Sequence, residues 1–208
     1  MKTLRIVVVL LLLAVLVTPL YSESLFVYPY NKTLDIISDV TQYTSLLLPL
    51  SLAFVSDSTS YLELSLMYGS TVLLTYGSRT LLKAVVDRNR PYTNFDDYPI
   101  KDDNNKSFPS GHTAFAFASA AFNQTIFSTR YKESSWYYPI TIGSWVLATT
   151  TAVLRVASGS HYASDVLAGA AIGTLFGVGI PLITDKVFKK EKIEVSVAPN
   201  LVAFNYSY

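Results

Sequence analysis

The sequence predicts an all-α fold: a helical bundle of about five to six mostly membrane-embedded helices with a possible short C-terminal β-hairpin. Hydrophobic residues make up 50% of the chain and charged residues only 15%, against roughly a quarter charged in soluble domains. Five stretches of 15 to 21 residues contain no Lys, Arg, Asp, Glu or His: 40–56, 64–78, 113–129, 134–154 and 166–184. These lengths lie near the lower limit for crossing a bilayer, and a compact helical bundle in water would contain similar stretches.

The N-terminal segment 1–22 has the pattern of a signal peptide or a first transmembrane helix. Lys2 and Arg5 precede the unbroken apolar run Ile6–Val17, which is short for a spanning helix and suits the core of a secretory signal. Leu20 is too large for an ideal cleavage site ending at Ser22. Both interpretations therefore stay open.

Residues 23–190 then form the main domain, and residues 191–208 form a C-terminal tail. In the tail, apolar and polar side chains alternate through Ile193–Val197 and again before Tyr208, with Pro199 and Asn200 between the two runs. This alternation is typical of a β-hairpin, although two strands alone are marginally stable and a frayed tail is the alternative.

Composition also limits the possible partners. The formal net charge is +1 and the chain contains no cysteine. A nucleic-acid partner has no electrostatic support, and disulfides and thiolate metal sites are excluded. The length of 208 residues suits one domain, and nothing in the sequence indicates the oligomeric state.

The most chemically informative stretch is 155–165, which holds Arg155, a Gly/Ser turn, His161 and Asp165. If a helix begins near Ser160, the i,i+4 spacing places His161 and Asp165 on one face. The carboxylate would then hold one ring nitrogen and leave the other free to act as a nucleophile. A histidine at a helix start beside an unrelated aspartate is the plainer alternative.

The second histidine, His112, follows Pro109, Ser110 and Gly111 and precedes an apolar run. Pro and Gly break the preceding structure, so a helix is expected to start here, with its first N–H groups available to an anion. Upstream, Lys83 and Arg90 are seven residues apart, close to two helical turns, so both cations are expected on one helix face before Pro91 ends that helix.

The three motifs together resemble the type 2 phosphatidic acid phosphatase (PAP2) and vanadium haloperoxidase superfamily. The matching patterns are K-x6-R-P at 83–91, P-S-G-H at 109–112 and R-x5-H-x3-D at 155–165, within a resemblance that covers about residues 60–185. One position departs from the family pattern, because Leu154 stands where the family usually has Ser before the arginine.

This resemblance implies a role for each motif residue. Lys83, Arg90 and Arg155 would hold the phosphoryl oxygens together with Ser110 and the Gly111 amide. His161 would attack phosphorus and form a phosphohistidine, Asp165 would orient His161, and His112 would protonate the leaving oxygen. Arginine forks and helix-end amides suit phosphoryl transfer, which depends on positioning and charge neutralisation. No metal or other cofactor is expected, because the carboxylates are scattered along the sequence.

Three further features concern access, packing and orientation. The polar segment 92–108 would form a lid over the site, or merely a solvated loop. Glycines at 169, 173 and 177 would form a small-residue face for close helix packing. Arg130, Lys132 and the lysines of 186–192 would lie opposite the site, so the positive-inside rule would place the site outside the cytoplasm, unless these are ordinary solvated helix ends.

The function expected from the resemblance is hydrolysis of a phosphorylated lipid, either a monophosphate or a diphosphate. Phosphatidic acid, phosphatidylglycerol phosphate, undecaprenyl pyrophosphate and lipid A are the candidate classes. The expected location is a bacterial-type inner membrane, with the site facing the periplasm. A soluble periplasmic acid phosphatase, a vanadate-dependent haloperoxidase and a non-enzymatic membrane protein that retains the motifs remain as alternatives.

Overall fold

The computed structural model describes residues 26–191, 193–198 and 201–206. The segment 1–22, predicted as a signal or first helix, lies outside the described residues. Five α-helices follow one another: α2 (Lys32–Leu47), α3 (Ser58–Val85), α4 (Gly111–Arg130), α5 (Tyr137–Ala157) and α6 (Ala163–Glu191). Short 3₁₀ helices η2 (Leu48–Phe54) and η3 (Pro91–Asn94) join them. The predicted all-α bundle is confirmed.

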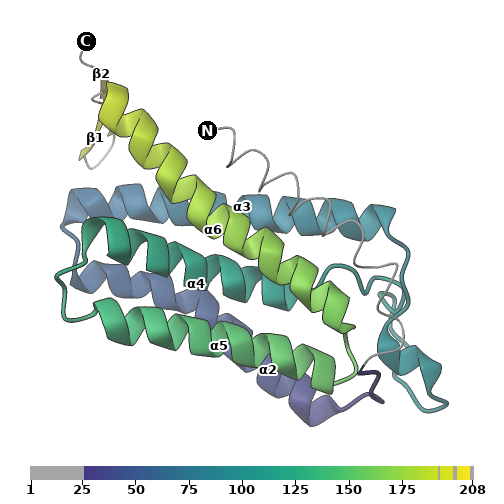
Figure 1. The fold of residues 1–208 in the computed structure, drawn as a ribbon. Helices are drawn as coiled ribbons and strands as arrows, with labels where there is room; N and C mark the ends of the chain where they lie inside the picture. The colour runs from purple at the N-terminus through teal and green to yellow at the C-terminus, as the bar shows by residue number, and fades with distance from the viewer. Residues whose placement is uncertain (1–25, 192, 199–200, 207–208) are drawn as a thin grey trace, which may run out of the picture.

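Helix α4 lies at the centre of the bundle and contacts α2, α3, α5 and α6 (Figure 1). Its alanines at 114, 116, 118, 120 and 121 are all buried, and these small side chains let neighbouring helices come close. Helix α6 crosses α4 along the predicted glycine face. A Cβ on Gly173 would lie 2.1 Å from the carbonyl oxygen of Ala114, so only glycine fits there.

Two features fix chain connections, the first beside the site and the second at the opposite end of the bundle. Gly159 has φ +70° in the turn between α5 and α6, and a Cβ there would lie 2.3 Å from the carbonyl oxygen of Tyr28. Pro49 interrupts the uncharged stretch 40–56, so the chain leaves α2 at Leu47 and turns through η2 toward α3. Both connections therefore follow from single residues.

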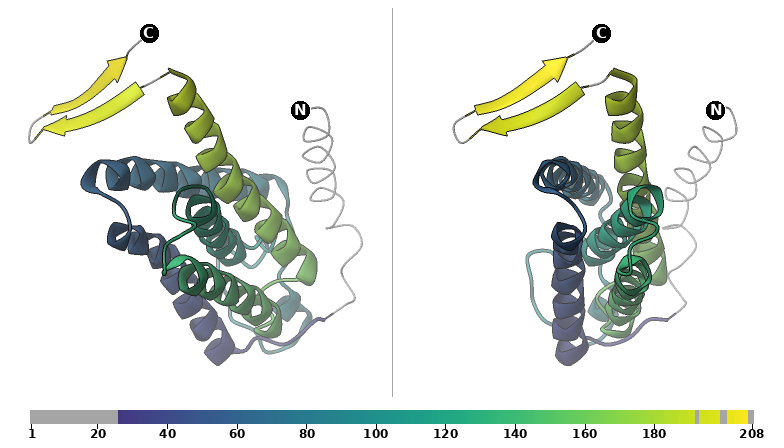
Figure 2. Two further views of the ribbon diagram at one scale, coloured as in Figure 1. Left: turned by 60° about the vertical axis from the view of Figure 1, so that its left-hand side comes forward. Right: turned by 90° about the vertical axis from the view of Figure 1, so that its left-hand side faces the viewer.

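The C-terminal hairpin is confirmed at the level of the backbone. Strands β1 (Ile193–Ala198) and β2 (Leu201–Tyr206) pair antiparallel, with Ile193 opposite Tyr206 and Ala198 opposite Leu201. The hairpin extends beyond the end of α6 (Figure 2).

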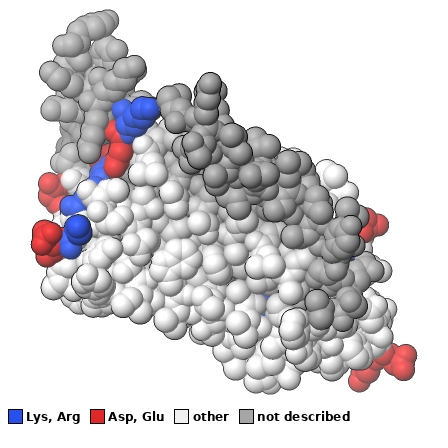
Figure 3. Space-filling view, viewed as in Figure 1, with Lys and Arg blue, Asp and Glu red and all other residues white. Residues whose placement is uncertain are grey.

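The outer surface of the bundle is strongly apolar. Large hydrophobic side chains such as Leu73, Leu81 and Val153 are 60% or more exposed. Figure 3 shows one face on which most of the visible charged side chains gather toward the two ends, with a largely uncharged surface of described residues between them. Within the described residues, the segments 137–157 and 163–186 are long and apolar enough to cross a membrane. These features fit a membrane-associated protein.

Candidate active site

The turn after α5 buries His161 at one end of the bundle. The His161 amide donates to the carbonyl oxygen of Arg155, 3.1 Å away, and the imidazole side chain is almost completely inaccessible. Helix α6 begins at Ala163 rather than near Ser160, so His161 lies in the turn and not on the helix. The structure nevertheless brings it to Asp165, with 3.6 Å between His161 Nδ1 and Asp165 Oδ2.

Asp165 is a fully buried carboxylate with several partners. Arg88 Nη1 lies 2.6 Å from its Oδ1, and Oδ2 accepts from the Ser107 hydroxyl at 2.5 Å and the Tyr162 amide at 2.9 Å. These contacts fix the direction of the carboxylate. At 3.6 Å the separation from His161 Nδ1 exceeds an ordinary hydrogen bond, and Nδ1 has no hydrogen-bond partner among the described residues.

The other ring nitrogen of His161 faces a cation. Arg90 Nη1 lies 3.2 Å from His161 Nε2. Burial, together with the charges of Arg90, Arg155 and Lys83, holds the pKa of His161 well below its usual value. The ring is therefore neutral, and because Arg90 can only donate, Nε2 carries the lone pair and Nδ1–H points toward Asp165.

The expected helical arrangement of Lys83 and Arg90 is wrong. Helix α3 ends at Val85, and residues 86–90 leave it as an extended segment. The loop that precedes α4 holds this extended segment in place, since the Arg88 and Arg90 amides donate to the carbonyl oxygens of Asn105 and Asn104. Both cations still reach the same cavity, because the extended segment turns Arg90 back toward His161.

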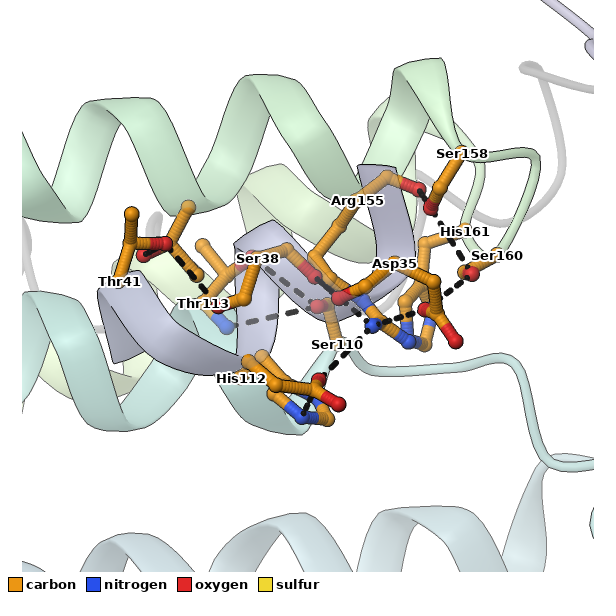
Figure 4. Close-up of polar contacts among 12 residues, drawn as sticks. Asp35, Ser38, Thr41, Ser110, His112, Thr113, Arg155, Ser158, Ser160 and His161 are labelled. Atoms are coloured by element: carbon orange, nitrogen blue, oxygen red, sulfur yellow. Dashed lines mark hydrogen bonds and ion pairs between the residues drawn. The ribbon is translucent and has the colours of Figure 1, made fainter. Parts of the chain in front are cut away.

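The three predicted phosphate-binding cations each have a partner in the free protein. Lys83 Nζ donates to the carbonyl oxygen of Lys106. Arg90 Nη2 lies 2.5 Å from Asp103 Oδ2. Arg155 Nη1 lies 2.5 Å from Asp35 Oδ1 and donates to the Ser38 hydroxyl at 3.0 Å (Figure 4). The cations are therefore already oriented by acceptors on α2 and on the segment 92–108.

The start of α4 is built as expected. Ser110 is the N-cap and its hydroxyl contacts the Thr113 amide and hydroxyl, at 3.5 and 3.0 Å. Gly111 and His112 form the first turn, and His112 Nε2 lies 2.9 Å from Asp39 Oδ1. Figure 4 shows His112 and Ser110 beside Asp35 and Arg155, which come from α2 and the end of α5.

A cavity of about 390 Å³ connects these groups. Five of the predicted site residues line it: Lys83, Arg90, Gly111, His112 and His161. The other three predicted residues, Ser110, Arg155 and Asp165, do not line the cavity. Ser110 adjoins the lining as the N-cap of α4, Arg155 through its contacts with α2, and Asp165 through His161. The combination of several cations, a helix N-terminus and a neutral histidine suits an anion that is attacked by nitrogen.

Sequence reasoning missed several groups of the site. Arg88 forms an ion pair with Asp165. Nothing in the sequence indicated that Arg88 and Arg90, two residues apart, have different roles. Asp35 and Asp39 lie one turn apart on α2, and this i,i+4 pair was the available signal for a shared face. Arg79 also lines the cavity, and it lies one turn before Lys83.

Among the described residues, no group of three His, Cys, Asp or Glu side chains is placed to hold a metal ion. The segment 92–108 lies against the site, because Asp103 contacts Arg90 and Lys101 lies 3.8 Å from Asp35. Burial raises the pKa of Asp103, but the charges of Arg90, Lys83 and Lys101 and the hydrogen bond from Arg90 together lower it below its usual value.

Two experimental structures resemble the fold. The crystal structure of Aquifex aeolicus LpxE aligns with a TM-score of 0.53 and 25% identity, covering 77% of this chain and 92% of that one. A transmembrane PAP2-type phosphatidylglycerolphosphate phosphatase from Bacillus subtilis aligns with a TM-score of 0.48 and 20% identity, covering 86% and 96%.

Sequence comparisons point in the same direction. Over 84 residues the chain is 42% identical to a lipid A 1-phosphatase of Porphyromonas gingivalis. That match covers 40% of this chain and only 17% of the relative's length. The sequence model of the PAP2 superfamily matches residues 63–189, which include all three motifs and every residue that lines the cavity from α3 onward. The chain therefore belongs to the PAP2 superfamily.

Proposed function

We propose that this protein is a phosphatase that removes phosphate from a lipid monophosphate or diphosphate through a phosphohistidine on His161. The observation that carries the proposal is the neutral, buried imidazole of His161, whose Nε2 faces a cavity with cations while its Nδ1 faces Asp165. Such a group is a nitrogen nucleophile held in the required tautomer.

The first step follows from this arrangement. His161 Nε2 forms a bond to phosphorus while the bond from phosphorus to the leaving oxygen breaks. Lys83, Arg90 and the Gly111 amide would neutralise the phosphoryl oxygens, with Arg155 and Ser110 completing the cradle. His112 would act as the general acid, with its Nε2 2.9 Å from Asp39 Oδ1. Burial and the charge of Arg155 lower the pKa of His112 to about 3 in the free site, so the negative charge of the bound substrate phosphate, together with Asp39, would have to raise that pKa before the imidazolium passes its proton to the leaving oxygen.

The second step regenerates the enzyme. Water attacks the phosphohistidine, the bond from phosphorus to nitrogen breaks, and its electron pair returns to His161 Nε2. His112 takes the proton from the water. Asp165 offsets the positive charge that His161 carries while it is phosphorylated, and Arg88 and Ser107 keep that carboxylate in place.

An apolar groove beside the site supports a lipid substrate. It has a volume of about 550 Å³ and is lined by apolar side chains of η2, α3 and α4, including Leu64, Val72 and Phe122. Phe115 lines both this groove and the phosphate cavity. A substrate with a phosphate head and an apolar chain could therefore occupy both together.

The location of the site follows from the same proposal. With the apolar flank of the bundle in a bacterial inner membrane, the site would face the periplasm, since Lys132 and Lys186 lie at the opposite end. Arg130 at that end is already paired with Glu63 and Asp185, so the orientation rests on the remaining lysines.

The experiment compares two leaving groups in His112→Ala and His161→Ala. A simple alkyl phosphate needs a proton on its departing oxygen, whereas a nitrophenyl phosphate does not. We expect His161→Ala to be inactive on both substrates. We expect His112→Ala to lose about 10²–10⁴-fold on the alkyl phosphate and much less on the nitrophenyl phosphate. Equal losses for His112→Ala would contradict the assignment.

Two further measurements test the intermediate and the chemistry. A quenched reaction of the unmodified protein should contain acid-labile phosphate on His161. Activity should persist in excess chelator and be inhibited by vanadate, because cations and amides bind the oxyanion. Phosphate trapped on His112, or activity lost in chelator and restored by a divalent metal, would overturn the mechanism.

A further inference from the structure

Arg79 is a fourth cation of the site that belongs to none of the three motifs. It lies on α3 four residues before Lys83, so the two side chains extend from the same face of the helix. Both line the cavity that contains His161. A Cβ on Gly111 would lie 3.0 Å from Arg79 Cδ and 3.1 Å from Nη1, so the guanidinium packs against the N-terminus of α4.

Arg79 differs from the other site arginines in having no anionic partner in the described part of the chain. Arg88, Arg90 and Arg155 pair with Asp165, Asp103 and Asp35. Among the described residues no carboxylate forms an ion pair with Arg79, and its Nε is buried without a hydrogen-bond partner. A partly buried cation left without an acceptor is costly unless a ligand supplies one.

Two aromatic rings hold the guanidinium in position. Its central carbon lies 5.1 Å from the ring centroid of Tyr76 and 5.8 Å from that of Phe115. These contacts fix the plane of the group without using its N–H donors. The donors therefore remain free to bind a planar or tetrahedral anion in a forked geometry.

The same two rings place Arg79 on the side of the cavity next to the apolar groove. Tyr76 lines the groove, and Phe115 lines both the groove and the cavity. If the phosphate that is transferred lies at His161 and the apolar chain lies in the groove, Arg79 is beside the part of the substrate between them. An anion bound by Arg79 would belong to the leaving group.

We propose that Arg79 binds a second anionic group of the substrate, next to the phosphate that is transferred, and that the protein therefore prefers lipid diphosphates over lipid monophosphates. This inference rests on the proposed phosphatase function and concerns its substrate class. In a lipid diphosphate the terminal phosphate would meet Lys83, Arg90 and His161, and the inner phosphate would meet Arg79.

The experiment measures kcat/KM for dodecyl phosphate and dodecyl diphosphate in the unmodified protein and in Arg79→Gln, from initial rates of phosphate release. We expect Arg79→Gln to lose at least about tenfold more on the diphosphate than on the monophosphate, the loss expected for one charge-assisted contact. Arg79→Lys should lose less, since it keeps the charge without the fork. Activity retained on the monophosphate shows that each variant is folded.

Lys132→Gln provides the matched control, because Lys132 is an exposed cation at the other end of the bundle. It should leave the ratio of the two kcat/KM values unchanged. Equal losses on both substrates in Arg79→Gln would mean that Arg79 binds the transferred phosphate, and no loss on either would mean that it binds no substrate anion. Both results overturn the inference. Failure of the unmodified protein to hydrolyse either lipid would instead refute the proposed function.

Discussion

Replacing Gly173 by alanine should destabilise the bundle, because α4 and α6 touch through their backbones at this position. The added Cβ would lie 2.1 Å from the carbonyl oxygen of Ala114 and 2.7 Å from the amide nitrogen of Ala118. Restoring ordinary van der Waals contact requires the helices to separate by about 1 Å or more. Neither contact involves a flexible side chain that could move aside.

The magnitude follows from two opposing effects. Overpacking a tight contact costs about 1–3 kcal/mol, and a rigid backbone contact places this substitution at the upper end. Alanine returns at most about 1 kcal/mol through its higher helix propensity. The net loss of unfolding free energy is about 2 kcal/mol, which lowers the midpoint of thermal unfolding by about 4–8 °C for a chain of this size.

Gly179 on the same helix provides the matched control. A Cβ there would meet no atom within 4 Å, so Gly179→Ala gains only the helix propensity and should raise the midpoint by about 2–4 °C. Thermal unfolding of both variants in one detergent, followed by circular dichroism, gives the comparison. Equal midpoints for the two variants would refute the close approach of α4 and α6.

Three further predictions concern the charged groups. Arg155→Lys keeps the charge but loses the planar fork, so kcat/KM should fall about tenfold or more; near-normal kinetics would mean that Arg155 does not support the phosphate cradle. Asp103→Asn removes the anion that occupies Arg90, so inorganic phosphate should inhibit more strongly, and weaker inhibition would show that Asp103 serves mainly to orient Arg90. Arg130→Met leaves Glu63 and Asp185 without their shared cation and should lower stability by about 2–3 kcal/mol, with kcat/KM unchanged below the unfolding transition; a loss of kcat/KM there would contradict its distance from the site.

The uncharged stretches predicted the bundle because burial and membrane contact both exclude unpaired charge. They located α4 within two residues at its start, but they underestimated α3, which extends through Glu63, Arg79 and Lys83. Each of these residues is charged and yet helical, because Glu63 pairs with Arg130 while the two cations face the site cavity. A helix that carries functional charge is therefore longer than its uncharged stretch.

The motifs predicted most of the cavity lining but not its supporting carboxylates. Lys83, Arg90, His112 and His161 are recognisable because they fall in the three motifs that resemble the family pattern. The i,i+4 spacing of Asp35 and Asp39 indicates a shared helix face but not what that face contacts, since the role of Asp35 depends on α2 packing beside α5, a contact between residues 120 positions apart in sequence. Partner choice between distant helices is decided by packing, which one sequence does not display.

These carboxylates form ion pairs with two of the site's cations before substrate binds. Arg90 and Arg155 each hold an aspartate, so an incoming phosphate must share or replace an existing ion pair, and its binding free energy is only the difference between the two. Among the described residues Arg79 has no carboxylate partner, so an anion that binds it displaces no existing ion pair. A second anionic group should therefore contribute more to discrimination between substrates than the transferred phosphate, which every substrate carries.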